Sequence, residues 1–170
     1  FTDVSVSGST YSGGIVGRGS PHISNRFALG NVHASNRDAG GLIALSGGVI
    51  TNSYSKGSVT SAGTKGGLVG RISGENANVV NSFWDVQTSG LTSSNGGEGK
   101  TTAEMNDPFT YQHADWDIYS VWATLPDSNS GYPILRIFQD FQVSANAPVA
   151  SNLYISGAIE VDSMLALAYD

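Results

Sequence analysis

Two aspartates in the second half of the chain have the spacing that acid–base chemistry could use. Asp115 and Asp117 flank Trp116, and strand geometry would place their Cα atoms about 6.6 Å apart on one face. Glycoside hydrolases use two carboxylates at a comparable separation. The alternative is that Trp116 points into a core and both carboxylates point into water. Because this second arrangement needs no special environment, we expect the two aspartates to be solvated surface groups.

Three further patterns resemble ligand-binding motifs but lack essential parts. Gly-Lys-Thr at 99–101 could end a phosphate-binding loop, but Ser94 stands where that motif needs glycine. Residues 127–131 begin like a calcium loop, but the glycine comes one residue early and the distal glutamate is absent, so we expect a polar turn. No metal-ligand spacing relates the histidines, His22, His33 and His113. The sequence therefore predicts no catalytic, cofactor-binding or metal-binding residue and indicates a protein that is not an enzyme.

The composition favours strands and tight turns over helices. Of the 170 residues, 22 are glycine and only 13% are charged, and the chain has no cysteine for disulfides or thiolate zinc sites. The net charge is −6 without a basic stripe, which argues against nucleic acid as a partner. The sequence has no apolar run long enough for a membrane span. Residues 1–10 lack the basic and apolar regions of a signal peptide, so we expect the numbering to begin inside a longer protein.

A sequence repeat sets the elements that must position these residues. Double glycines followed by apolar residues begin at 13, 40 and 66, at spacings of 27 and 26 residues. Each double glycine is followed by an asparagine and then an aromatic residue, in the pairs Asn25 and Phe27, Asn52 and Tyr54, and Asn81 and Phe83. Three short strands with their turns would fill each repeat, which is too short for a strand-helix-strand unit.

One coil per repeat is the arrangement that pairs such strands. Stacked coils place each strand beside its equivalent and bury the apolar positions. The sequence thus predicts an all-β fold, a parallel β-solenoid (β-helix) of about three coils over residues 1–87. The aromatic residues would form one ladder and the asparagines another, at a turn. The double glycines would supply positive φ or a close approach of backbones at a corner.

The repeats resemble a known family of bacterial surface proteins. Gly-Gly-Leu-Val-Gly at 66–70, followed by an Asn-Ser-Phe strand at 81–83, is similar to the GLUG repeat of bacterial adhesins and other large surface proteins. The likeness continues to a closing segment, Gly-Tyr-Pro-Ile-Leu-Arg at 131–136, and it departs at Ala44, where the other repeats have glycine. The resemblance implies a secreted or surface-anchored repeat protein, and it carries over no catalytic residue.

Residues 88–140 break the repeat, and we interpret them as a capping segment. They contain a cluster of aromatic residues, at positions 109, 111, 116, 119, 122 and 132. A solenoid end exposes strand edges that a different unit must cover. Thr101 and Glu104 have the spacing of a capping box, which would begin a short helix. The alternative is a carbohydrate platform, in which exposed Trp and Tyr residues of this cluster stack on sugars, although clustered aromatic residues more often pack in a core.

Residues 141–170 are interpreted as a linker and incomplete immunoglobulin-like strands. The runs at 147–157 and 164–169 are similar to the opening of immunoglobulin-like repeats in bacterial surface proteins, but a sandwich needs about seven strands. Two strands alone are marginal in water. We therefore expect a neighbouring chain or module to hold this segment.

These interpretations together predict a structural or adhesive repeat segment of a secreted or cell-surface bacterial protein. Its expected partners are neighbouring modules of the same long protein or a neighbouring chain, and a surface glycan or protein receptor, with no cofactor and no nucleic acid. The alternative is a polysaccharide-binding or polysaccharide-processing module, based on the late aromatic residues and on Asp115 and Asp117. Binding to a glycan array that is lost in Trp116→Ala and Trp122→Ala would favour this alternative.

Overall fold

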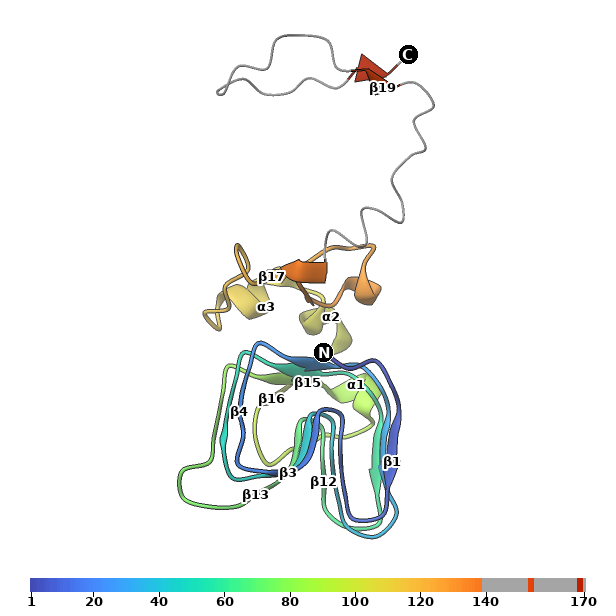
Figure 1. Ribbon diagram of the computed structural model, residues 1–170, viewed down its shortest axis with the longest axis vertical. Coiled ribbons are helices and arrows are strands. Elements are labelled where there is room, and N and C mark those ends of the chain that lie inside the picture. Colours follow the sequence, from blue (N-terminus) through green and yellow to red (C-terminus); the bar gives the residue numbers. More distant parts are fainter. Residues whose placement is uncertain (139–152, 155–167, 170) are drawn as a thin grey trace.

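The computed structural model, which describes residues 1–138, 153–154 and 168–169, is a parallel β-solenoid (Figure 1). Equivalent strands of successive coils pair in parallel, and together they form five sheets that run along the stack. The predicted all-β parallel solenoid is confirmed.

Each of the five sheets contains the same strand from successive coils. The first sheet contains β1 (Val6–Gly8), β6 (Val32–Ala34) and β11 (Val59–Ser61). The second contains β2 (Tyr11–Gly13), β7 (Asp38–Gly40) and β12 (Lys65–Gly66). The third contains β3 (Val16–Gly19), β8 (Ile43–Ser46) and β13 (Val69–Ile72). The fourth contains β4 (His22–Ser24), β9 (Val49–Thr51) and β14 (Asn78–Val80). The fifth, which we call the ladder sheet, contains β5 (Phe27–Ala28), β10 (Tyr54–Ser55), β15 (Phe83–Asp85) and β16 (Glu98–Lys100).

A full coil therefore has five short strands, whereas the sequence predicted three. One of the two additional breaks comes at the double glycines, where the chain turns between the second and third sheets. A Cβ atom on Gly41 would lie 2.1 Å from the Gly67 carbonyl oxygen and 2.5 Å from the Ser55 Oγ, so a close approach of backbones requires glycine there. The double glycines are not among the glycines with positive φ. Of their two predicted roles, close approach is the one the structure confirms.

Asparagines take the left-handed positions instead. Asn25, Asn52 and Asn81 have φ values of 53°, 47° and 48°, and each lies at the corner that leads into the ladder sheet. Among residues with a Cβ atom, asparagine tolerates this conformation unusually well. The predicted alignment of the asparagines at one turn is confirmed, and the backbone conformation gives its physical reason.

The aromatic ladder is also confirmed. Tyr54 pairs in register with Phe27 on one side and Phe83 on the other. The rings of Phe27 and Tyr54 stack with centroids 5.3 Å apart and planes 3° apart. Phe1 adds a further rung, with its centroid 4.8 Å from that of Phe27.

The apolar residues form clusters on both sides of the ladder sheet. The largest cluster inside the coils contains Ile23, Ala28, Leu42, Ile43, Ile50, Leu68, Val69 and Trp84. A smaller cluster contains Val32, Ala34, Ala39 and Val59. The ladder itself belongs to a separate cluster with Met105, Tyr111, Trp116, Trp122 and Tyr132. Its rings therefore point out of the coil and are buried by the segment that follows.

That segment, residues 101–138, is called the covering segment here. It contains α2 (Thr102–Met105), α3 (Pro108–Gln112), β17 (Trp122–Ala123), β18 (Ile134–Leu135) and 3-10 turns at Asn129–Gly131 and Arg136–Phe138. Thr101 caps α2 with the predicted capping box. Figure 1 shows the segment outside the coils, above β15. The sequence predicted a cap over the end of the stack, but the segment packs on the flank because the outward-facing ladder needs an apolar cover.

An incomplete last coil, residues 86–100, covers the end of the stack and is called the shortened turn. β15 leads into α1 (Val86–Ser89), and β16 then pairs in parallel with β15. Between them, the Ser93 carbonyl accepts a hydrogen bond from the Gly67 N–H and the Asn95 N–H donates to the Val69 carbonyl. The predicted solenoid boundary at 87 is thus corrected: the stack continues to Lys100, and only the residues after it cover the ladder.

Two short strands are described beyond residue 138. β19 (Leu153–Tyr154) pairs antiparallel with β20 (Ala168–Tyr169). The rest of the predicted linker and immunoglobulin-like strands at 141–170 lies outside the described residues, so that interpretation stays a prediction.

Candidate functional site

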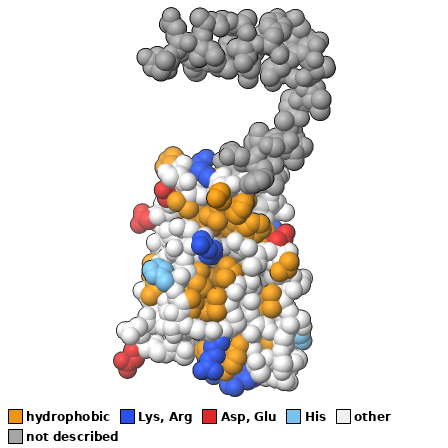
Figure 2. Space-filling view, viewed as in Figure 1, with side chains coloured by type: hydrophobic (Ala, Val, Ile, Leu, Met, Phe, Trp, Pro, Cys, Tyr) orange, Lys and Arg blue, Asp and Glu red, His pale blue; other side chains and the backbone are white. Residues whose placement is uncertain are grey.

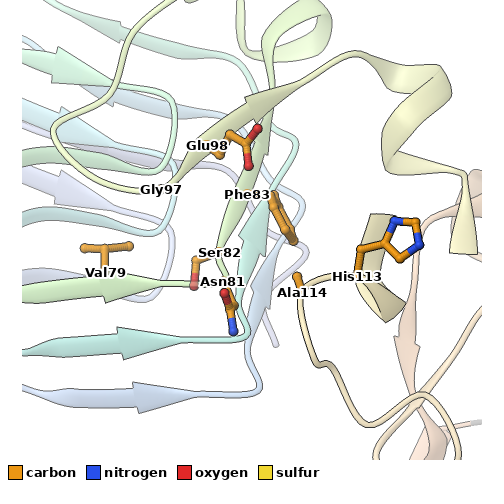
Figure 3. Close-up of a pocket in the computed structure, with 8 residues that line it drawn as sticks. All are labelled: Val79, Asn81, Ser82, Phe83, Gly97, Glu98, His113 and Ala114. Atoms are coloured by element: carbon orange, nitrogen blue, oxygen red, sulfur yellow. The ribbon is translucent and has the colours of Figure 1, made fainter. Parts of the chain in front are cut away.

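A cleft of about 340 Å³ opens where the third coil meets the covering segment (Figure 3). Its lining residues come from the end of the fourth sheet, the ladder sheet and the end of α3, namely Val79, Asn81, Ser82, Phe83, Gly97, Glu98, His113 and Ala114. In Figure 3, Asn81 and Phe83 face Ala114 across the opening, with His113 on the α3 side. Serine, glutamate and histidine in one cleft are residue types that could catalyse hydrolysis, so their partners decide what the cleft can do.

Ser82 and Glu98, two polar residues of the cleft, are engaged elsewhere. The Ser82 hydroxyl donates to the Val80 carbonyl oxygen at 2.8 Å and accepts from the Ser53 N–H at 3.2 Å. The Glu98 carboxylate pairs with Lys100 at 2.7 Å. Catalysis by a nucleophile would need a base within hydrogen-bond reach of it. The hydroxyl of Ser82 instead fixes the corner between two coils, so the cleft lacks an assembled nucleophile and base.

The two aspartates of the sequence analysis are exposed turn residues. Asp115 lies after α3 with φ 54°, and Asp117 follows Trp116, which is only 4% exposed. The Asp117 carboxylate accepts the backbone N–H groups of Ser120 at 2.7 Å and Tyr119 at 3.1 Å. These hydrogen bonds, chiefly that of Ser120, hold the pKa of Asp117 below its ordinary value. The expectation of a solvated pair with Trp116 inward is confirmed, although the pair lies in turns rather than on a strand.

The motif-like segments are parts of the scaffold. Residues 98–100 form β16, and Thr101 begins α2, so the Gly-Lys-Thr run lies between a strand and a helix cap. The run at 127–131 is a turn in which the Asn129 side chain donates to the Tyr54 hydroxyl at 2.8 Å. His33 contacts the Thr60 hydroxyl in the next coil at 2.8 Å. Within the described residues, no group of three histidine, aspartate or glutamate side chains could hold a metal ion.

Trp116 and Trp122 do not form an exposed platform for sugars. Trp122 is fully buried, and the centroids of the two indole rings lie 4.5 Å apart within the cluster that covers the ladder. Their ring N–H groups donate to the Asn81 carbonyl and to the Asn25 side chain, at 2.7 and 3.2 Å. The two tryptophans therefore fasten the covering segment to the asparagine corners. The proposed sugar platform is wrong for these residues, because an interior ring cannot reach a ligand.

Asp85 is a buried acid that the sequence analysis did not identify. Its Oδ1 accepts the Gln87 and Thr88 N–H groups at 2.7 and 3.0 Å, which caps α1. Its Oδ2 accepts the Thr102 hydroxyl at 2.7 Å and the Tyr132 hydroxyl at 2.5 Å. Burial alone would raise the pKa of Asp85, but these four hydrogen bonds outweigh it and lower the pKa.

The same carboxylate joins the stack to the covering segment. Desolvation, together with the hydrogen bond to Asp85, raises the pKa of Tyr132 to about 12, so this phenol remains a donor at neutral pH. Asp85 thus has a structural role. A capping position after a Phe-Trp pair is the one signal in the sequence that could have indicated it.

The first coil presents an open face at one end of the stack. Its strands β1 to β4 pair on one side only. Val16 is half-buried, whereas its register partner Ile43 and the equivalent Val69 are fully buried. Phe1 is 50% exposed, whereas Phe27 is 2% exposed. The first coil thus leaves unpaired strand edges and part of the apolar core uncovered, while the shortened turn covers the opposite end.

These features define a class of protein, a parallel β-solenoid module with one covered end, one open end and a flank covered by aromatic residues. The chain is similar to a protein of Evansella cellulosilytica named "Putative Gly-rich membrane protein", with 36% identity over 112 residues. The match covers 62% of this chain and 13% of that protein. The chain matches no family model and no solved structure. The GLUG resemblance stays a prediction. Among the described residues, no helix has the length and apolar character that crossing a bilayer needs.

Proposed function

We propose that the chain is a structural or adhesive repeat segment of a secreted or cell-surface bacterial protein, in which it ends a longer solenoid. The observation that supports this most directly is the difference between the two ends of the stack. The shortened turn pairs with the third coil at Gly67, Val69 and β15, where the core side chains of that coil are buried, whereas the first coil has unpaired strand edges and leaves core side chains partly exposed. Such an edge is a template for another strand, and only a further coil would continue all the sheets at once.

The surface of the module supports display rather than catalysis. The buried acid is a cap, and the Ser82 hydroxyl of the cleft links two coils. The relative from Evansella cellulosilytica is named a membrane protein and is several times longer than this chain, which is consistent with one module among many. The partners we propose are therefore the neighbouring modules of the same long protein, with the exposed flanks of the coils as the surface available to a receptor.

A fusion that lengthens the stack tests the proposal. Residues 27–53, the second coil, would be placed directly before Phe1, so that Phe1 follows them as Tyr54 does in the native chain. We expect a higher midpoint of urea unfolding and slower hydrogen exchange at β1 to β4, because their free edges become paired. A fusion with the same 27 residues in scrambled order is the matched control. If the two fusions gave equal midpoints and equal exchange, the open edge would not be a stacking surface, and the proposal would fail.

A further inference from the structure

Arginines recur at one position of the third sheet. Arg18 of the first coil and Arg71 of the third both pair in register with Leu45. Neighbouring strands lie about 4.8 Å apart, so the Cα atoms of the two arginines are about 10 Å apart along the stack. Figure 2 shows Lys and Arg side chains gathered at the end of the molecule opposite the covering segment. A protein of net charge −6 thus has a locally basic face.

Two of the guanidinium groups share one aromatic ring. The Cζ atoms of Arg18 and Arg37 lie 5.4 and 5.1 Å from the centre of the Tyr11 ring. Both arginines are exposed, and the ion pairs found among the described residues involve neither of them. Cation–π contact holds the two like charges near each other. This arrangement leaves their hydrogen-bond donors available to an anion.

The third arginine is oriented by a buried carboxylate. Asp38 pairs in register with Tyr11, is 1% exposed, and accepts a hydrogen bond from Arg71 at 2.5 Å through Oδ1. Its Oδ2 is buried and has no hydrogen-bond partner in the described part of the chain. A buried carboxylate oxygen without a partner destabilises a fold. The Asp38 and Arg71 pair is therefore better explained by the position it gives the guanidinium near Asp38, the register partner of Tyr11, than by stability.

We propose that this face, formed by Tyr11, Arg18, Arg37 and Arg71 and called the arginine face, binds an acidic polysaccharide through its carboxylate groups. Guanidinium groups match carboxylates with two parallel hydrogen bonds. The groups follow the stack axis, so an extended polymer can contact several of them in succession. The inference rests on the adhesive form of the proposed function and gives it a ligand class.

The surroundings of Tyr11 favour a sugar polymer over single-stranded nucleic acid. Proteins that bind single strands stack the bases on open aromatic rings. Here two guanidinium groups already lie against the ring of Tyr11. A polymer with carboxylates and no bases needs only the outward donors of the arginines.

Binding to polygalacturonate, measured by isothermal titration at low ionic strength, tests the inference. Neutral dextran and a single-stranded DNA oligonucleotide serve as comparison ligands. The test variant is Arg18→Gln with Arg37→Gln, and the matched control is Arg26→Gln with Lys100→Gln, which removes the same charge at other sites. Arg26 donates to the Ser24 and Asn25 carbonyls, away from the arginine face. Thermal unfolding of each variant establishes that it is folded.

We expect the wild type and the control to bind polygalacturonate and the test variant to bind at least about tenfold more weakly, with binding weakened by salt. Equal weakening of both double variants would show an effect of net charge alone and would overturn the inference, as would no binding by the wild type. Equal or stronger binding of DNA or dextran would also overturn it. None of these outcomes affects the result of the coil fusion, so the arginine face can fail while the proposed function stands.

Discussion

At the scale of single residues, Tyr54 connects the repeat to the covering segment. It is fully buried in the middle of the ladder, and its ring is stacked between repeat and covering-segment aromatics. Its hydroxyl donates to the Pro133 carbonyl at 2.7 Å and accepts from the Asn129 side chain. Burial raises the pKa of this hydroxyl well above its ordinary value, so it remains a neutral donor. The ring and the hydroxyl can be removed separately, which allows each contribution to be measured.

Truncation of Tyr54 to alanine should lower the free energy of unfolding by about 3–5 kcal/mol, as is usual for buried aromatic residues. Tyr54→Phe retains the ring and removes the hydrogen bonds of the hydroxyl with Asn129 and Pro133, so we expect a loss of about 1–3 kcal/mol. Urea denaturation of the two variants measures both. If the alanine variant lost no more than about 0.5 kcal/mol, the size of a surface effect, the ladder would not be a core.

At the scale of elements, the sequence was informative wherever the repeat imposed the same environment three times. The register of Phe27, Tyr54 and Phe83 followed from spacing alone because stacked coils align equal positions. Spacing does not predict on which side of the sheet the ladder lies, since an aromatic residue suits either the coil interior or a covered flank. Because the side of the ladder was ambiguous, the sequence predicted the covering segment as a cap on the end of the stack rather than as a cover on its flank.

The arginine face and the two buried aspartates are harder to predict from the sequence than the ladder. Arg18 and Arg71 recur at the interval of the double glycines, which could have indicated the arginine face, but Leu45 interrupts the series. The burial of Asp38 and Asp85 depends on contacts with Arg71 and Tyr132, which lie far away in the sequence. Such long-range contacts cannot be inferred from spacing.

The turn at the double glycines gives a prediction at this scale. A Cβ atom on Gly41 would meet the backbone of the next coil at 2.1 Å, whereas one on Gly19 would lie 3.7 Å from its nearest neighbour, Pro21. We expect Gly41→Ala to destabilise the protein by about 1–3 kcal/mol or more through overpacking. Gly19→Ala should change stability by no more than about 1 kcal/mol. Thermal and urea unfolding of the two variants would detect the difference, and equal losses would show that coils can separate to admit a methyl group.

At the scale of the whole molecule, the stack of coils and the covering segment are stabilised in different ways. The stack satisfies its backbone by pairing coil with coil, whereas the covering segment depends on the aromatic cluster and on a few polar links. Trp116 and Trp122 donate to two asparagine corners, and Asp85 accepts from Thr102 and Tyr132. Because Asp85 is the ionised member of these links, protonating it should weaken the attachment of the covering segment.

This gives stability a dependence on pH whose sign follows from the direction of the shift. The pKa of Asp85 is lower in the folded protein than in the unfolded chain, so its ionised form stabilises the fold. That contribution is complete above the unfolded pKa of about 4, and it is lost as the pH falls through the lower, folded pKa.

The variant Asp85→Asn isolates this contribution. It lacks the charge of Asp85 at every pH, while all other carboxyl groups are common to both proteins. We therefore expect the wild type to have the higher urea midpoint at pH 7, and the difference from Asp85→Asn to shrink steadily as the pH falls below about 4. Tryptophan fluorescence is a suitable signal, since Trp116 and Trp122 lie where the covering segment meets the ladder. A difference that stayed constant down to the acid limit of folding would mean that the pKa of Asp85 does not change on folding, and the charge of Asp85 would then not stabilise the link between the two parts.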